Sequence, residues 1–320
     1  MVELSLDTDV PTARSITDAR WPTRRLARFL LSRIRIGRLT IVTPSGVRVS
    51  SHPTEPGPEG VLVLHRWRTL RRLLLQGDVS FAEAYMDGDW SSPDLPALIE
   101  LAARNAPTLN RAIDGHAASR WINRLRHRLN ANTRRGSQRN ITFHYDLGND
   151  FYAAWLDPGM TYSSGLYGPG AATLEDAQTA KQDRAIALLE LTAEHDVLEI
   201  GCGWGGLAER IVDRTGCHVT GLTLSQAQLA YATERLSRAG LSDRAAFALR
   251  DYRDQDGIFD RIVSIEMLEA VGEAYWPAYF ATLRDRLRPG GIAVLQAITI
   301  AEDRFEAYRR CPDFIQHYIF

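Results

Sequence analysis

A short apolar run leads directly into a glycine-rich turn at residues 197–206, which read VLEIGCGWGG. The turn contains a GxGxxG pattern, which also occurs in NAD and FAD sites and in ordinary tight turns. Glycine lets a ligand approach the backbone, and such a turn presents free amides at the start of the next helix. Glu199 stands two residues before the first glycine, as is typical of sites for S-adenosylmethionine (SAM). We therefore predict a SAM pocket lined by Glu199, Gly201, Cys202, Gly203 and Gly206.

The composition is that of a globular protein without a recognisable metal or disulfide motif. The chain has 320 residues, 45% hydrophobic and 24% charged, which suits two domains or one large domain. Its cysteines, Cys202, Cys217 and Cys311, lack the spacing of metal ligands or of a disulfide framework, which favours a reducing cytoplasm. No apolar run approaches the ~20 residues of a membrane span, and residues 1–15 lack the apolar core of a signal peptide.

Charge is distributed unevenly along the chain. Residues 1–140 contain 22 arginines, no lysine and 13 acidic residues, which gives a net charge of +9. Residues 141–320 contain 16 basic and 26 acidic residues, which gives −10. A cationic half joined to an acidic half predicts a polyanionic surface as partner. A solvated, arginine-rich surface explains the same counts equally well.

The first part of the chain predicts a flexible tail at 1–19, a small α+β domain at 20–115 and a basic linker at 116–140. Arginines are interleaved with apolar residues at 24–36, which suits an amphipathic helix at a membrane interface or a helix packed on its own domain. The linker contains seven arginines and suits contact with phospholipid headgroups, and no nucleic-acid-binding module is recognisable. The other expected elements are a hairpin at 39–50, a strand at 61–64, and helices from Trp67 and at 95–103.

From residue 141 onward, strand-like runs alternate with helical patterns, which favours an α/β fold with a mainly parallel sheet covered by helices. A helix marked by Trp276, Tyr279 and Phe280 is expected to bury its aromatic side chains and to be stopped at Pro289. The apolar sequence up to residue 320 has no capping hairpin, so we expect the C-terminal part of the domain at 141–320 to be absent. The candidate strands are 197–200, 218–222, 245–249, 260–265 and 292–298.

Several longer stretches resemble the cyclopropane-fatty-acyl-phospholipid synthases and the mycolic acid methyltransferases. The resemblance covers roughly residues 25–320 and implies a Rossmann-like, class I SAM-dependent methyltransferase domain behind a small lipid-binding domain. The matching segments are AYMDGDW at 84–90, FHYDLGNDFY at 143–152, LDPGMTYSS at 156–164, GLTLSQAQ at 221–228 and DRIVSIEMLEAVG at 260–272.

The resemblance also implies how SAM is held. The strand at 218–222 ends without the acidic residue that often binds a ribose, and Gln228 is similar to the family's substitute. The implied contacts are Tyr162 and Ser163 at the amino-acid end of SAM, Thr223, Leu224 and Gln228 along the second SAM segment, and Asp251 and Tyr252 beside the adenine.

The implied reaction transfers the methyl group of SAM to a cis double bond in an acyl chain of a membrane phospholipid. The alkene is a weak nucleophile, so a dry site must hold it close to the electrophilic methyl group. Attack leaves a carbocation; proton loss from the added methyl closes a cyclopropane, and proton loss elsewhere gives a methylene or branched chain. The resemblance implies bicarbonate as the base, held by Glu269, by the backbone at Ile298 and by a backbone carbonyl at Ser164.

Two positions depart from the family pattern. Many relatives have histidine where this chain has Gln296, and Glu-His where it has Glu269-Ala270. A glutamine can donate a hydrogen bond but cannot carry a proton, so the fate of the cation stays open between a cyclopropane and a methylene or methyl-branched product. Glu266 is given no catalytic role, and His144 is expected to be structural.

Three functions compete for this sequence. The first is methyl transfer to phospholipid acyl chains; the second is SAM-dependent methylation of a small polar acceptor; the third is a lipid-binding protein with an inactive site. The basic first half disfavours the second function, and Glu269 with the intact glycine turn disfavours the third. We expect a cytoplasmic protein, peripherally associated with the inner face of an anionic membrane, with no metal and no nucleic-acid partner. A homodimer is left open.

Overall fold

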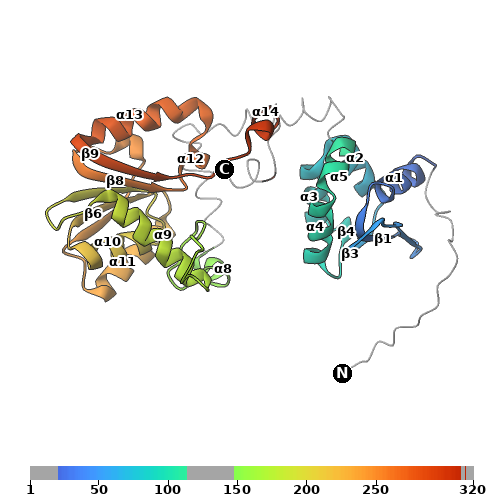
Figure 1. The fold of residues 1–320 in the computed structure, drawn as a ribbon, viewed down its shortest axis with the longest axis horizontal. Helices are drawn as coiled ribbons and strands as arrows, with labels where there is room; N and C mark the ends of the chain where they lie inside the picture. Colours follow the sequence, from blue (N-terminus) through green and yellow to red (C-terminus); the bar gives the residue numbers. More distant parts are fainter. Residues whose placement is uncertain (1–20, 114–147, 311–313, 315–320) are drawn as a thin grey trace, which may run out of the picture. The chain divides into compact units, whose positions relative to one another are not determined.

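The computed structural model describes residues 21–113, 148–310 and 314 (Figure 1). The predicted tail at 1–19, the basic linker at 116–140 and His144 therefore lie outside the described residues. The chain divides into two compact units, one that contains residues 21–113 and one that contains 148–306. Within the described residues, no helix is both long and apolar enough to cross a bilayer, and no cluster of His, Cys, Asp and Glu could hold a metal ion.

The first unit is a four-stranded sheet with helices packed on it, in the order β2-β1-β3-β4. β1 and β3 pair in parallel, and the other two pairs are antiparallel. The predicted hairpin is confirmed, with Thr40 opposite Ser50. The elements are α1 (Trp21–Leu31), β1 (Ile36–Val42), β2 (Arg48–Ser50), β3 (Glu55–Leu64), α2 (Arg68–Gln76), α3 (Asp78–Met86), β4 (Trp90–Ser91), α4 (Leu95–Arg104) and α5 (Ala106–Ile113).

The helix expected at 24–36 is shorter than its arginine pattern predicted. α1 ends at Leu31, and the chain enters β1 at Ile36. The side-chain oxygen of the buried Asn105 accepts hydrogen bonds from the backbone N–H groups of Arg35 and Ile36 at 2.8 and 3.1 Å. This contact fixes the chain as it enters the sheet, and it comes from 70 residues away in the sequence. The local pattern therefore could not reveal it.

Several arginines of the first unit are held in internal ion pairs. The buried carboxylate of Asp89 accepts hydrogen bonds from the guanidinium of Arg68 at 2.5 and 2.9 Å. Arg66 and Arg72 approach the same carboxylate to 3.3 and 3.6 Å. The hydrogen bond from Arg68 is the main reason why the pKa of Asp89 lies below its ordinary value. Part of the positive charge of this half is therefore used within the fold rather than offered to an external anion.

The second unit is built on a five-stranded, all-parallel sheet, as predicted, in the order β7-β6-β5-β8-β9. After β5, the chain adds β6 and β7 on one side of that strand and then adds β8 and β9 on its other side. Sheets with this reversal bind ligands at the carboxyl ends of the strands beside it, here β5 and β8. The elements are α8 (Asn149–Ala153), α9 (Leu174–Leu189), β5 (Asp196–Ile200), α10 (Gly206–Thr215), β6 (His218–Thr223), α11 (Gln226–Ala239), β7 (Ala245–Leu249), η1 (Tyr252–Asp254), β8 (Phe259–Ile265), α12 (Leu268–Val271), η2 (Glu273–Tyr275), α13 (Trp276–Arg286) and β9 (Leu287–Gln296). The last helix, α14 (Glu302–Arg310), contains the division between the two units.

Side chains alternate along these strands between two hydrophobic cores, because successive residues point to opposite faces. Val197 and Val263 belong to the core that includes residues of α9, α10 and α11. Leu198 and Ile262 belong to the core that includes residues of α13, which Figure 1 shows at the top of this unit, away from α10 and α11. Phe280, expected to be buried, is instead 47% exposed, because its neighbours on α13 take the buried face.

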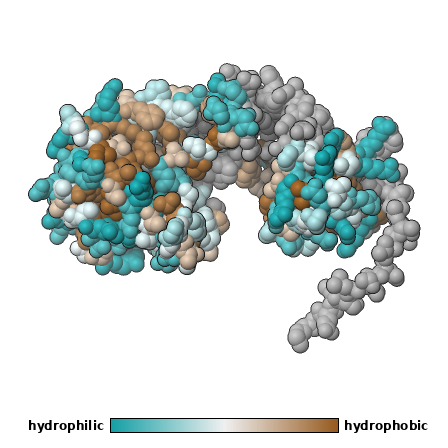
Figure 2. Space-filling model, viewed as in Figure 1, coloured by the Kyte–Doolittle hydropathy of each residue, from teal (hydrophilic) through white to brown (hydrophobic). Residues whose placement is uncertain are grey.

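The last strand begins earlier than predicted. β9 spans Leu287–Gln296, so Pro289 lies inside the strand, and α13 has already ended at Arg286. Proline cannot donate to a ladder and is tolerated on a strand with one neighbour, and within the described residues β9 pairs with β8 alone. Ile298, which is 64% exposed, lies beyond the strand. Figure 2 shows hydrophobic surface on this unit around the positions of β8 and β9.

Candidate cofactor pocket and active site

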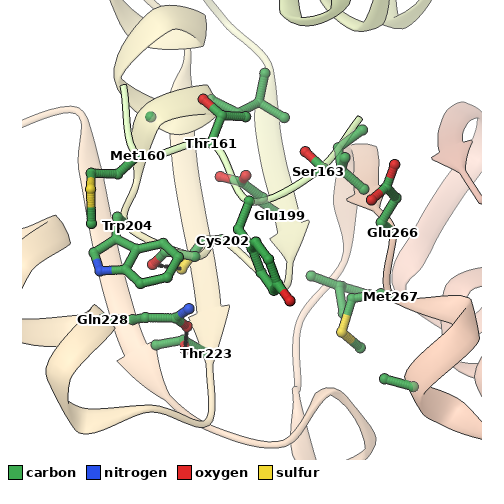
Figure 3. Close-up of a pocket in the computed structure, with 18 of the residues that line it drawn as sticks. Met160, Thr161, Ser163, Glu199, Cys202, Trp204, Thr223, Gln228, Glu266 and Met267 are labelled. Carbon is green, nitrogen blue, oxygen red and sulfur yellow. Dashed lines mark hydrogen bonds between the residues drawn. The ribbon is translucent and has the colours of Figure 1, made fainter. Parts of the chain in front are cut away.

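A cavity of about 730 Å³ opens at the carboxyl ends of β5, β6 and β8. Figure 3 shows Glu199 near its centre, Trp204 on one side and Glu266 on the opposite side. Every residue predicted to contact SAM lines this cavity, and of the predicted catalytic set only Gln296 does not. The predicted residues in the lining are Tyr162, Ser163, Ser164, Glu199, Gly201, Cys202, Gly203, Gly206, Thr223, Leu224, Gln228, Asp251, Tyr252, Glu269 and Ile298.

The turn between β5 and α10 has a backbone that glycine adopts most readily. Gly201, Gly203 and Gly205 have φ angles of 83°, 52° and 80°. The N–H groups of Gly201 and Cys202 donate to the carbonyl of Leu222 at 3.0 and 2.9 Å, which ties the turn to β6. A Cβ built on Gly203 would meet no atom within 4 Å, so this glycine borders open cavity. The turn therefore leaves room for a ligand against the backbone.

Glu199, in β5, has a buried carboxyl group. Its side chain is 3% exposed, and its Oε2 atom accepts no hydrogen bond within the described residues. Burial raises the pKa of Glu199 to about 8. A buried carboxyl group that borders a cavity is stabilised in its charged form by a nearby cation. SAM carries a positive sulfonium and a positive ammonium, so this side chain fits a ligand of that kind.

The end of β6 presents a second polar group to the cavity. The hydroxyl of Thr223 donates to the Oε1 atom of Gln228 at 2.8 Å, and the hydroxyl of Ser225 accepts from the backbone N–H of Gln228 at 3.3 Å. Within the described residues, the Nε2 atom of Gln228 donates to no group. The carboxylate of Asp251 is paired with the guanidinium of Arg253 at 2.8 and 2.5 Å. Gln228 therefore has a donor left for a ligand.

Lys181 on α9 lines the cavity and was missed by the sequence reasoning. It is 6% exposed, and its ammonium donates to the hydroxyl of Ser163. Burial lowers the pKa of Lys181 to about 8, with smaller opposing effects from the carboxylates of Glu266 and Asp157. Gln178, one turn earlier, donates to the carbonyl of Ser163 at 2.6 Å. The available signal was a glutamine and a lysine among the apolar residues of one face of this helix, which also carries Ala185, Ile186 and Leu189.

Two glutamates after β8 stand at one side of the cavity, and the sequence reasoning assigned a role to only one of them. Glu269 on α12 accepts a hydrogen bond from the backbone N–H of Ile298 through Oε1, and its Oε2 is buried without a partner within the described residues. Glu266 accepts hydrogen bonds from Ser164 and from the side-chain amide of Gln296. The structure thus brings Gln296 beside Ser164 as part of the same cluster.

Aromatic side chains form the opposite wall. Tyr152 is buried, with its ring centroid 5.0 Å from that of Trp204 and 5.5 Å from that of Tyr162. The indole N–H of Trp204 donates to the side-chain oxygen of Asn149 at 2.8 Å, which anchors the glycine turn to α8. Tyr162 and Trp204 line the cavity, and Tyr152 packs behind them. Trp204 was not predicted, although it lies within the glycine motif itself.

Residues 132–320 match the family model described as mycolic acid cyclopropane synthetase. A tuberculostearic acid methyltransferase from Mycobacterium tuberculosis is 39% identical over 272 residues, which make up 81% of this chain and 62% of that protein. A cyclopropane-fatty-acyl-phospholipid synthase from Escherichia coli is 33% identical over 288 residues, 89% of this chain and 68% of that protein. The chain spans about half to two thirds of the length of such relatives.

Solved structures give the same result. The cyclopropane synthase MmaA2 from Mycobacterium tuberculosis is 32% identical, with a TM-score of 0.53 over 57% of this chain and 67% of that one. The mycolic acid cyclopropane synthase CmaA1, solved with SAH and CTAB, is 31% identical, with a TM-score of 0.50 over 56% of this chain and 62% of that one. These matches confirm the predicted methyltransferase fold and the predicted resemblance, and the chain belongs to the mycolic acid cyclopropane synthetase family.

Proposed function

We propose that this chain transfers the methyl group of SAM to the cis double bond of an unsaturated acyl chain in a membrane phospholipid. The observation that carries the proposal is the cavity at the ends of β5 and β8, where an open glycine turn meets the buried carboxyl of Glu199, whose Oε2 atom has no hydrogen-bond partner among the described residues. Relatives named as a cyclopropane-fatty-acyl-phospholipid synthase and as a fatty acid methyltransferase support acyl chains as the substrate class.

The residues of the cavity fit SAM. Glu199 offers a buried negative charge to a cationic ligand, the turn at Gly203 offers open backbone, and Gln228 offers a donor. Tyr162 and Ser163 are proposed to hold the amino-acid end. When bound, SAM supplies an electrophilic methyl group. The aromatic wall is proposed to limit the access of water to the bound reactants, because an alkene is a weak nucleophile and needs a dry site.

The product is proposed to be a cyclopropane fatty acid, with a methylene- or methyl-branched chain as the second candidate. All follow from the same cation on the acyl chain: proton loss from the added methyl group closes the ring, the same loss after a 1,2-hydride shift gives the methylene chain, and proton loss from a chain carbon gives a methyl-branched alkene. The observation that keeps the second candidate open is Gln296, whose amide donates to Ser164 and Glu266 but cannot take up a proton.

Bicarbonate, the base implied by the family resemblance, does not fit the described donor set. The N–H of Ile298 already donates to Glu269. The N–H and hydroxyl of Ser164 donate to Glu266, and the amide of Gln296 donates to both of these residues. An added anion would find these donors engaged and would face two carboxylates. No step is therefore assigned to it.

The proposed place of action is the inner face of the cell membrane, with the protein attached peripherally from the cytoplasm. Exposed arginines of the first unit, such as Arg28 and Arg71, are proposed to contact anionic headgroups. A partner nucleic acid is not proposed, and a homodimer stays a prediction.

The test uses the full chain, SAM, and vesicles of phospholipids with either cis-monounsaturated or fully saturated acyl chains. The expected result is release of S-adenosylhomocysteine with unsaturated vesicles only. Proton NMR of the extracted fatty acids then distinguishes the products, because ring protons of a cyclopropane appear upfield. Equal release with saturated vesicles, or release only with a small amine acceptor, would refute the proposed substrate.

A further inference from the structure

We propose that the carboxylate of Glu266 is the base that removes a proton from the cation on the acyl chain, so that the chain supplies its own anion at this place. The inference rests on the proposed methyl transfer, since only such a cation needs this base. The observation behind it is that the N–H and hydroxyl of Ser164 and the side-chain amide of Gln296 all converge on a carboxylate of the protein.

The hydrogen bonds to the side chain of Glu266 all end on one of its two oxygens. Oε1 accepts from the N–H and the hydroxyl of Ser164 at 3.0 and 2.6 Å, and from the Nε2 atom of Gln296 at 2.8 Å. Oε2 accepts no hydrogen bond within the described residues, and Glu266 lines the cavity. A carboxylate anchored through one oxygen leaves the other positioned to accept a proton.

The backbone of Glu266 is held in an unfavourable conformation. Its φ angle is 49°, in the left-handed region that residues with a Cβ rarely adopt. Its N–H donates to the carbonyl of Gln296 at 2.8 Å, so one residue of β9 fixes both the backbone and the side chain of Glu266. A glycine would adopt this backbone with less strain. Strain beside a cavity points to a functional side chain.

The neighbouring Glu269 is less suited to this role. Its Oε1 is engaged by the backbone N–H of Ile298, and its Oε2 is buried. Glu269 therefore holds the segment that follows β9 and acts as a positioning residue. The ammonium of Lys181 lies close enough to Glu266 for the two charges to interact.

In the proposed step, the Oε2 atom of Glu266 accepts a proton from the methyl group that has been added to the acyl chain. The electron pair of that C–H bond forms the carbon–carbon bond that closes the ring, and the carboxylate becomes a neutral acid. If the proton comes from a chain carbon beside the cation, the same electron pair forms a double bond, and the product is a methyl-branched alkene. The positive charge is discharged in both cases, and no oxidant or reductant is needed.

The first test is Glu266→Gln in the full chain with unsaturated vesicles. Glutamine keeps the Oε1 atom that accepts three hydrogen bonds, but its amide cannot take up a proton. Turnover should fall by about the 10²–10⁴-fold attributed to positioned bases, with unchanged affinity for SAM in calorimetry. Glu234→Gln, which changes an exposed carboxylate on α11, is the matched control and should leave both values unchanged.

The second test is anion rescue of Glu266→Gly, which removes the carboxylate and relieves the backbone strain. Because the donors of Ser164 and Gln296 are then free, bicarbonate or formate added to carbonate-free buffer should restore turnover, whereas wild type should not respond. A purely structural role of Glu266 would not produce rescue by an anion.

Full turnover of Glu266→Gln, a wild type that requires added bicarbonate, or failure of both anions to rescue Glu266→Gly would each overturn the assignment while leaving methyl transfer intact. Absence of any methylated fatty acid from wild type would overturn the proposed function, and the assignment with it.

Discussion

Two buried ionisable side chains of the cavity, Glu199 and Lys181, have protonation equilibria that a ligand can shift. Burial raises the pKa of Glu199 to about 8 and lowers the pKa of Lys181 to about 8. At neutral pH the carboxyl group is therefore mostly neutral and the amine mostly charged. A cation beside Glu199 favours its ionised form, so the binding of SAM should be coupled to the loss of a proton.

We predict that binding of SAM to wild type at pH 7 releases up to one proton. Calorimetry in two buffers with different ionisation enthalpies measures this number directly. Glu199→Gln should abolish the release of the proton, because a side-chain amide does not ionise. The surface variant Glu234→Gln should retain the release. Identical binding enthalpies of wild type in the two buffers would show that Glu199 does not face the charge of SAM.

The same pKa predicts how stability depends on pH. Glu199 in the folded chain has a pKa of about 8, above the ordinary value of 4.5, so between these values the folded state binds more protons than the unfolded state. Its contribution is fully present below pH 4.5 and is lost as pH rises through 8, at a slope of up to about 1.4 kcal/mol per pH unit. Urea unfolding of wild type and Glu199→Gln should show the wild type losing stability relative to the variant over this window; parallel pH curves would contradict the shift.

The cavity-lining residues proposed to hold SAM could be found from the sequence because they lie in continuous motifs at strand ends, where type and spacing indicate a pocket. Lys181 and Glu266 could not, because their partners are distant in sequence. Lys181 bonds to Ser163 from 18 residues away, and Glu266 bonds to Ser164 from 102 residues away. Only the order of the strands in the sheet brings these groups together.

At the scale of elements, the turn between β5 and α10 can be tested with two matched glycines. Gly203 and Gly240 both have positive φ angles, 52° and 70°, and a Cβ on either would meet nothing within 4 Å. Gly203 borders the cavity, whereas Gly240 caps α11 and is absent from the lining. Alanine at either site should cost roughly 1–2 kcal/mol in backbone strain.

Gly203→Ala should weaken the binding of SAM, because its methyl group enters open cavity, and Gly240→Ala should not. Urea unfolding checks that the two variants lose similar stability, and calorimetry compares their affinities. If both variants bind SAM as wild type does, the ligand does not lie against this turn.

The strands of the parallel sheet were predictable from their alternation with helices. The elements whose bounds differ from the prediction differ because of tertiary contacts. β3 starts at Glu55, although only 61–64 was expected, because prolines and glycines hide its first half. Gly57 lies so close to Gly37 of β1 that a Cβ would come within 2.8 Å of the Gly37 nitrogen. These glycines weaken the local sequence signal for a strand, but they also allow the two strands to approach each other closely.

At the scale of the whole molecule, the uneven charge predicts binding to anionic membranes. The full chain should co-sediment with anionic vesicles more than with neutral ones. Added salt should weaken this binding, because exposed charges are screened beyond ~8 Å at physiological ionic strength. The net charge of +9 already counts the acidic partners of Arg68 and Arg72, so binding should depend on other arginines of this half.

The variant that tests this surface is Arg28→Gln combined with Arg71→Gln, two exposed positions of the first unit. Arg238→Gln combined with Arg284→Gln removes the same charge from exposed positions of the second unit and is the control. The first pair should reduce vesicle binding more than the second. Equal reduction by both pairs would show that net charge alone, not the first unit, governs binding.

The central claim of this account is that the methyl carbon of SAM ends in a phospholipid acyl chain. It is tested most directly by incubating the full chain with SAM whose methyl group carries three deuterium atoms and with vesicles of cis-monounsaturated phospholipid, followed by mass spectrometry of the fatty acids. The account predicts fatty acids that have gained one carbon, with two deuterium atoms if the proton is taken from the added methyl group and three if it is taken from the chain. Fatty acids that contain no deuterium, while SAM is consumed or another acceptor is labelled, would contradict it.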